Sequence, residues 1–205
     1  MKTLDLKKQF APYYRQKRGI VSIVDVPPSN FLMIDGRGDP NTAPEFHEAL
    51  ETLYALSYTL KFMLKMDRKA YDYPVMPLEG LWWSADGKTF DMDRRRDWRW
   101  TVMILQPDVI TPALLAEAQT AVRKKKNPAA LGRERLERFH EGLAAQVLHI
   151  GPYAAEGPTI AQMHEFIRAK GYGLRGKHHE VYFGDPRRAN PANLKTILRQ
   201  PVATG

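Results

Sequence analysis

The chain of 205 residues contains no cysteine. This absence excludes disulfide bonds, a thiolate nucleophile and metal sites built on cysteine. No continuous apolar run reaches about 18 residues, the length at which a helix begins to span a membrane. The first residues, Met1 to Lys8, lack the apolar core of a secretion signal. We therefore expect a cytoplasmic protein with no membrane partner.

Positive charge is in excess, but much of it lies at one end of the chain. The formal net charge is +8, and residues 1–18 alone account for +5 through six basic side chains and one acidic side chain. The cluster Arg94–Arg96 lies among aspartates, and Lys124–Lys126 ends a predicted helix, where cations suit the helix dipole. No nucleic-acid-binding motif accompanies the charge. We therefore expect no nucleic-acid partner.

Metal and cofactor motifs are also missing. His178 and His179 are adjacent in a strand-like run, so their rings point to opposite faces and cannot bind one metal ion. Gly36-Arg37-Gly38 precedes a predicted helix but lacks the third glycine of a phosphate-binding loop. No serine lies in the setting of a hydrolase nucleophile. We expect no cofactor and no metal site.

The predicted elements occur twice in the order strand, helix, strand, strand. Apolar periodicity gives a strand at 31–34, a helix at 44–65 and strands at 74–83 and 98–105, followed by a strand at 143–150, a helix at 159–170 and strands at 178–183 and 195–200. A further helix at 112–126, with Thr111 as N-cap and Pro112 in its first turn, bridges the halves.

This duplication predicts an α/β (α+β) fold with a pseudo-two-fold antiparallel sheet. We expect one domain over residues 1–205, made of pseudo-repeats at about 20–105 and 130–202, because no Gly- or Ser-rich linker separates them. A central cleft between the halves is the natural place for a ligand. Residues 1–18 are expected to form a peripheral basic arm whose loss leaves ligand binding intact.

One strand-like run, His178-His179-Glu180-Val181-Tyr182-Phe183, points to that ligand site. Alternation along a strand puts Glu180 and Tyr182 on the same face. A carboxylate that faces a domain interior is costly unless a cation, a hydrogen-bond donor or a reacting group meets it. The alternative, which the strand alone leaves open, is an exposed sheet face with a solvated Glu180.

Several further runs resemble the GyrI-like small-molecule-binding proteins, in particular their free-standing branch. The runs are VMPLEGLWW (75–83), WRWTVMI (98–104), EGL (141–143), QVLHIGPY (146–153) and LKTILRQPV (194–202), in addition to HHEVY (178–182). The resemblance implies a duplicated fold with a ligand cleft on the concave side of its sheet. Some members of this branch are cyclopropanoid cyclopropyl hydrolases, which inactivate DNA-alkylating natural products inside an aromatic cage, whereas other members only bind ligands.

The resemblance also implies which aromatic residues line the cleft. All four tryptophans lie in the two central strands of the first half, and the family pattern favours Trp82 and Trp100 for the cage. Trp83 and Trp98 fit the core better. Tyr58, on the long helix, and Tyr153, in the loop before the second helix, are candidates to close the cage. Either tyrosine also fits a partly buried core position.

Two functions follow for Glu180. In a hydrolase it acts as the general base, and a donor such as Tyr182 or Tyr58 stabilises the charge that builds on the substrate oxygen. In a pure binder the carboxylate complements a cationic ligand among aromatic faces. The alternative classes are a non-enzymatic sequestering or regulatory protein and a gyrase-inhibitor-like interaction protein. The sequence leaves the natural ligand and a homodimer open.

Overall fold

The computed structural model describes residues 1–84, 95–184 and 189–204. Two sequence features, the turn-like run Ser84-Ala85-Asp86-Gly87 after the predicted strand at 74–83 and the Arg94–Arg96 cluster, lie partly outside these residues. The described strands of the main sheet are β2 (Ser22–Val26), β3 (Ser29–Arg37), β5 (Leu78–Ser84), β6 (Trp98–Gln106), β7 (Arg135–Phe139), β8 (Gly142–Ile150), β9 (Tyr172–Leu174), β10 (His178–Phe183) and β11 (Lys195–Thr204).

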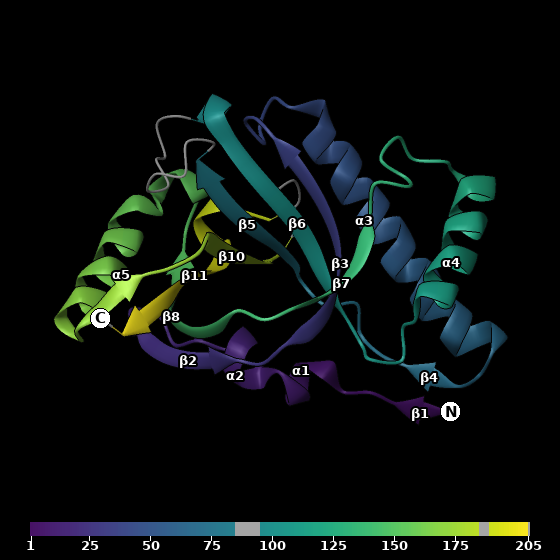
Figure 1. Cartoon of the computed structure of the whole chain (residues 1–205), viewed down its shortest axis with the longest axis horizontal. Coiled ribbons are helices and arrows are strands. Elements are labelled where there is room, and N and C mark those ends of the chain that lie inside the picture. Colours follow the sequence, from purple (N-terminus) through teal and green to yellow (C-terminus); the bar gives the residue numbers. More distant parts are fainter. Residues whose placement is uncertain (85–94, 185–188, 205) are drawn as a thin grey trace.

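Helices flank this sheet at several places along the chain (Figure 1). They are α1 (Leu6–Gln9), α2 (Ala11–Tyr14), α3 (Pro44–Phe62), α4 (Pro112–Lys125) and α5 (Gly157–Ala169), with a π-helical turn η1 (Met63–Asp67) and 3-10 turns η2 (Arg95–Asp97), η3 (Tyr153–Ala155) and η4 (Pro191–Asn193). A separate parallel pair joins β1 (Lys2–Thr3) to β4 (Tyr71–Asp72).

The sheet has the predicted pseudo-two-fold order. Its strands run β2-β8-β11-β10-β5-β6-β3-β7, with β9 paired to β11 outside this path. The antiparallel neighbours β5 and β10 form the centre, where Gly80 lies opposite Glu180 and Trp82 lies opposite His178. Outward from this centre, β6 and β3 mirror β11 and β8. The duplicated antiparallel fold predicted from the sequence is confirmed.

Each half gives its leading strand to the other half. The strand β2 precedes β3 in the chain but pairs with β8, from Ser22 opposite Gln146 to Val26 opposite Gly142. Likewise β7 precedes β8 but pairs with β3, between Ser29 and Phe139 at one end and Met33 and Arg135 at the other. The sequence analysis missed β2 and β7. The exchange ties the two halves into one sheet.

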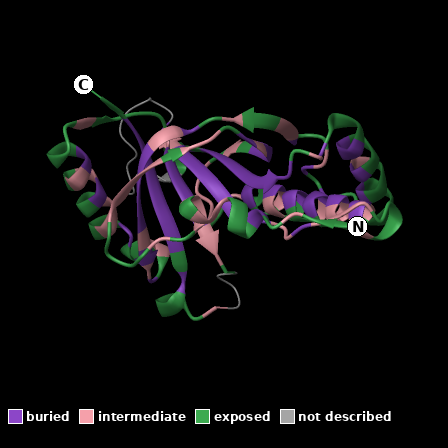
Figure 2. Cartoon of the chain, turned by 90° about the horizontal axis from the view of Figure 1, so that it is seen from below, coloured by how far each residue is buried: buried purple, intermediate pink, exposed green. Residues whose placement is uncertain are grey.

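The helices α3 and α5 cover the same face of the sheet. In α3, Phe46, Leu53 and Leu60 are buried at seven-residue spacing, and the ring of Phe46 packs on Trp82 and Trp100. In α5, Met163 and Ile167 belong to the apolar cluster of the second half. Buried residues accordingly line the strands, whereas much of the outer helix surface is exposed (Figure 2).

Two predicted boundaries illustrate local rules. The helix α4 begins as expected, because the Thr111 side chain accepts a hydrogen bond from the Leu114 backbone N–H at 3.2 Å and Pro112 occupies the first turn. The strand expected from residue 74 begins only at Leu78. Pro74 and Pro77 lack the N–H that a central strand must donate, which explains the later start.

The N-terminal segment is docked rather than peripheral. Leu6 is 2% exposed, and Phe10 and Tyr14 pack against the main core. The Tyr14 hydroxyl donates a hydrogen bond to Glu79 of β5. The expectation of a loose arm is therefore wrong for residues 6–14, since their apolar side chains are part of the core. Within the described residues, no helix is long and apolar enough to cross a membrane.

Candidate functional site

A chain of three side chains lies on the helix-covered face of the central strands. The Tyr182 hydroxyl donates a hydrogen bond to Glu180 Oε2 at 2.6 Å and accepts one from Trp82 Nε1 at 2.9 Å. Glu180 is 7% exposed and Trp82 is 3% exposed, so both are largely removed from water. The structure thus brings Glu180, Tyr182 and Trp82 together, as the alternation of β10 and β5 predicts.

Gly80 makes this arrangement sterically possible. It lies opposite Glu180 in β5, and a Cβ atom at this position would lie 2.7 Å from Trp82 Nε1 and 3.1 Å from Tyr182 Oη. The missing side chain lets the indole and the phenol approach across the strand. A glycine inside a predicted strand is the signal that would have found this residue.

The second half of the chain adds two groups from the segment before α5. The ring of Tyr153 packs edge-on against Tyr182, with 5.6 Å between the ring centroids. Glu156, which the sequence analysis missed, follows three residues later and is 1% exposed. Its backbone N–H donates to Tyr153 and its carbonyl oxygen accepts from Ile160, so η3 and α5 both fix its position.

His149 anchors the same segment. Its Nδ1 lies 3.0 Å from the Thr159 hydroxyl and its Nε2 lies 3.3 Å from the Pro152 carbonyl oxygen. Gly151, with φ of +141°, makes the turn between them. His149 is therefore a hydrogen-bonded, buried histidine that holds Tyr153 and Glu156 over the sheet.

The electrostatics of the site favour neutral forms beside Glu180. Burial raises the pKa of Tyr182 well above its usual value, and Glu180 and Glu156 add to the rise. Burial and then the charge of Glu180 raise the pKa of Glu156 to about 10, against a smaller opposite effect of Thr196. The second oxygen of Glu180, Oε1, lies 3.2 Å from His178 Nε2.

Trp100 lies one layer deeper than the sequence analysis expected. It is 0% exposed, its ring meets Phe46 edge-on at 5.2 Å, and a Cβ atom at Gly36 would lie 2.1 Å from the indole. Trp98 is buried as expected and packs on Trp82 at 5.5 Å. In this structure Trp100 therefore supports the site from within the core, without facing an open cleft.

Tyr58 lies on the exposed flank of α3. It is 47% exposed, and its ring stacks on those of Tyr54 and Phe62 at centroid distances of 6.5 and 6.3 Å. These three residues are spaced by four along the helix and form one aromatic stripe. The ring of Tyr58 is thus accessible from solvent, in contrast to Trp82 and Trp100.

Trp83 lies on the opposite face of the sheet from Trp82 and packs against the main core, as expected, but at its partly exposed margin. It is only half-buried, and Lys177 Nζ lies 3.5 Å from its ring centroid. It borders a shallow groove of about 410 Å³, whose other lining residues are Asp35, Gly36, Arg37, Glu45, Arg99, Arg133, Arg135 and Lys177.

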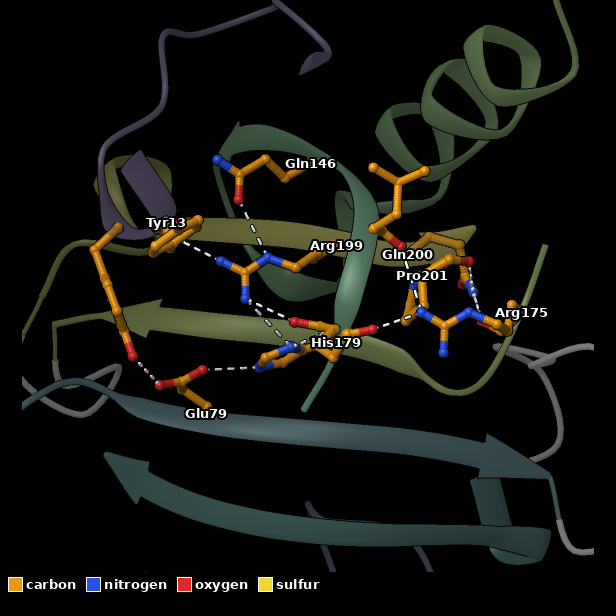
Figure 3. A network of polar contacts seen from close by, with 11 residues as sticks. Tyr13, Glu79, Gln146, Arg175, His179, Arg199, Gln200 and Pro201 are labelled. Atoms are coloured by element: carbon orange, nitrogen blue, oxygen red, sulfur yellow. Dashed lines mark hydrogen bonds and ion pairs between the residues drawn. The ribbon is translucent and has the colours of Figure 1, made fainter. Parts of the chain in front are cut away.

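A buried charge network lies behind the site, on this opposite face (Figure 3). His179 is within 2.8 Å of Glu141 and 2.9 Å of Glu79, and Arg199 Nη1 donates to Glu141 at 3.0 Å. Arg199 also donates to the Tyr13 carbonyl oxygen at 2.6 Å, which links the network to the N-terminal segment. The network balances two acidic groups with two basic groups.

These contacts fix the protonation states of the network. Although burial acts in the opposite direction, the charge of Glu141 and hydrogen bonds to Glu141 and Glu79 raise the pKa of His179 to about 9. Burial likewise opposes the change at Glu141, where His179 and Arg199 lower the pKa to about 2. Within the described ranges, no three histidine or acidic side chains are grouped as metal ligands.

Comparisons with known proteins point to one family. Residues 21–203 match the family described as the GyrI-like small molecule binding domain. A search of curated proteins found no match. Among solved structures, an uncharacterized conserved protein from Listeria innocua is 42% identical, with a TM-score of 0.89, and the alignment covers 98% of this chain and 100% of that protein.

Two further structures are similar to the chain. A hydrolase from Listeria innocua is 41% identical, with a TM-score of 0.86, and the alignment covers 98% of this chain and 100% of the hydrolase. The C-terminal domain of EcmrR is 11% identical, with a TM-score of 0.56 and coverage of 91% and 98%. The similarity to the EcmrR domain shows only that the two proteins share a fold.

Proposed function

Because the chain belongs to the GyrI-like small-molecule-binding family, we propose that it binds aromatic or cationic small molecules beside Glu180 and hydrolyses strained electrophiles among them. The observation that carries this proposal is the hydrogen-bonded chain from Trp82 through Tyr182 to Glu180. It places an acidic group, a phenol and an indole at the junction of the two halves, where a ligand would be held by both.

In this proposal the aromatic residues differ in how close they lie to the ligand. Trp82 and Tyr153 form the walls nearest to Glu180, and Tyr58 forms the outer wall through its exposed ring. Trp100 holds Trp82 in place from the core together with Phe46. For a cationic ligand, each aromatic face contributes about 0.5–2 kcal/mol in addition to the attraction of an ionised Glu180.

The hydrolytic step uses Glu180 as the base. Glu180 accepts a proton from a water molecule, whose oxygen forms a bond to a cyclopropane carbon. The carbon–carbon bond of the ring breaks, and its electron pair moves into the conjugated dienone. The dienone oxygen then takes up a proton and becomes a phenol. The Tyr182 hydroxyl, held by Trp82 and Glu180, passes its proton to this oxygen, and Glu180 returns the proton it took from water to the Tyr182 oxygen 2.6 Å away, so that both groups regain their starting states.

The likeness to the Listeria innocua hydrolase supports the catalytic part of the proposal, since two fifths of the residues are identical over nearly the whole chain. Ring strain supplies much of the driving force, so a base and a hydrogen-bond donor suffice. If the protein does not turn over its ligand, the same site fits a sequestering or regulatory protein. The following experiment distinguishes hydrolysis from binding alone.

The test is the variant Glu180→Gln with a cyclopropyl-dienone compound as substrate. The glutamine keeps the shape of the side chain but cannot act as the base, so single-turnover hydrolysis should fall by roughly 10²-fold or more. Affinity for the neutral substrate, measured by quenching of tryptophan fluorescence, should change little. Glu165→Gln, an exposed change on α5, is the control and should behave as the parent.

Three outcomes are possible in this test. Turnover in the parent that survives in Glu180→Gln shows that Glu180 is not the base. No turnover in the parent, with selective loss of cationic ligands in the variant, identifies a binder of cations. A variant that equals the parent in both assays contradicts the proposed site.

A further inference from the structure

One buried carboxyl group beside the proposed ligand site lacks a counter-charge. Glu156 is 1% exposed, and its Oε1 has no hydrogen-bond partner among the described residues. Its carboxyl group is close enough to Glu180 for their charges to interact. Two carboxyl groups in a water-poor place do not both ionise unless a cation or several donors compensate them.

Glu141 shows what this fold does with a carboxyl group that stays ionised. It is also buried, at 3% exposed, but His179 lies 2.8 Å away and Arg199 Nη1 lies 3.0 Å away. Its pKa is lowered to about 2, because these two groups outweigh its burial. Glu156 is buried to the same degree without such partners. The difference between the two glutamates lies in their neighbours.

The neighbours of Glu156 come from each element packed around it. Burial, His178 and Arg168 all lower the pKa of His164, so His164 does not supply a positive charge near neutral pH. The basic residues Arg168 and Lys195 are exposed, and Arg199 lies on the other face of the sheet. The titratable groups on this side are Tyr153 of η3, His149 of β8, His164 of α5 and His178, Glu180 and Tyr182 of β10.

We propose that Glu156 and Glu180 form a charge-sensing pair, in which the empty site holds one proton on Glu156 and a cationic aromatic ligand releases that proton to solvent. This inference rests on the proposed binding function and adds a second carboxyl group to it. The two carboxyl groups of the empty site then carry one negative charge between them. A bound cation makes the second negative charge favourable, and a neutral ligand does not.

The sign of the pH dependence follows from this linkage. A bound cation lowers the pKa of Glu156 from its raised value, so the complex binds fewer protons than the empty protein. Affinity for a permanent cation should therefore rise with pH, by up to about tenfold per pH unit while Glu156 is protonated in the empty protein and ionised in the complex. Affinity for a neutral ligand of similar shape should not rise.

The first experiment uses the full chain without a ligand. Glutamate labelled with 13C in the side-chain carboxyl group reports protonation by its NMR shift, and the signal lost in Glu156→Gln identifies residue 156. We expect this signal to remain in the protonated position at about pH 8, far above the usual carboxyl range. Glu165→Gln, exposed on the same helix, should remove a signal that titrates normally. An ionised Glu156 at about pH 7 overturns the inference.

The second experiment adds tetraphenylphosphonium, a permanent aromatic cation, at about pH 8. We expect the Glu156 signal to move to the ionised position, and the affinity to rise about tenfold or more between about pH 7 and pH 9. Glu156→Gln should abolish this rise, and triphenylphosphine oxide, a neutral analogue, should not show it. Binding with an unchanged Glu156 signal overturns the proton release.

A failure of the proposed function gives a different result. If tetraphenylphosphonium leaves tryptophan fluorescence unchanged at all concentrations, this class of ligand does not bind, and the proton-release part of the inference is also wrong. The spectrum of the empty protein still decides the protonated state of Glu156. The two failures are therefore distinguishable.

Discussion

At the scale of single residues, Gly80 controls the geometry of the candidate site. A methyl group there would come within 2.7 Å of the Trp82 indole nitrogen. We predict that Gly80→Ala separates Trp82 from Tyr182 and weakens ligand binding roughly fivefold, the value of one hydrogen bond of about 1 kcal/mol. The measurement is fluorescence quenching by tetraphenylphosphonium. Gly173→Ala, whose new Cβ meets its nearest atom only at 4.0 Å, is the control and should bind as the parent.

The residue scale also shows where prediction from the sequence succeeds. The common face of Glu180 and Tyr182 follows from strand alternation, and Trp82 meets them because β5 and β10 pair at Trp82 and His178. The depth of Trp100 does not follow from alternation, because it depends on where α3 lays Phe46 over the sheet. The sequence around Glu156 does not indicate that this residue is buried in the site, since a glutamate just before a helix usually lies in solvent.

At the scale of elements, the N-terminal segment acts as a lid over the buried charge network. We predict that Tyr14→Phe lowers the free energy of unfolding by about 1–3 kcal/mol, because it leaves a buried oxygen of Glu79 without its donor. The measurement is urea denaturation. Tyr13→Phe is a matched control, since Tyr13 contributes its backbone carbonyl oxygen to Arg199 and should keep that bond. Equal losses in both variants would contradict the role given to the Tyr14 hydroxyl.

Deletion of the segment tests the corrected view of residues 1–15. Because Leu6, Phe10 and Tyr14 pack on the core, we expect the truncated chain to unfold at clearly lower urea concentration than the full chain. Deletion of residues 1–3 alone, which are exposed, is the control. Unchanged stability after the longer deletion would restore the idea of a peripheral arm, which composition alone suggested.

At the scale of the whole molecule, the buried network predicts how stability depends on pH. The pKa of His179 is raised to about 9, so its contribution is complete below its unfolded value of about 6.5 and is lost as pH rises through about 9. The pKa of Glu141 is lowered to about 2, so its contribution is complete above about 4.5 and is lost as pH falls through about 2. Both contributions are complete only between about pH 4.5 and 6.5.

We therefore predict that the free energy of unfolding of the variant Glu156→Gln falls between about pH 6 and pH 9 by an amount of the order of 3 kcal/mol through His179. The variant is used because the raised pKa of Glu156 would add its own fall over this range. Urea denaturation at several pH values measures this change. A flat profile over that range would show that His179 is not protonated in the folded protein.

The overall architecture followed from the sequence further than the site did. Two strand–helix–strand–strand units were visible because α3 and α5 carry apolar residues at helical spacing and the central strands are apolar runs. The edge strands β2 and β7 were missed because they are short and half-exposed, and their pairing with the opposite half is a tertiary event. The local sequence pattern of an edge strand does not show which half of the sheet the strand pairs with.

The exchange of β2 and β7 makes the molecule suited to division into two complementary fragments. A cut in the exposed turn after α4, near Asn127, would leave one piece with β2, β3, β5 and β6 and the other with β7, β8, β10 and β11. Each piece alone would expose unpaired strand edges, which favour aggregation. Together the two pieces would pair through both exchanged edges, so they would behave as a self-assembling split protein whose association rebuilds the proposed ligand site.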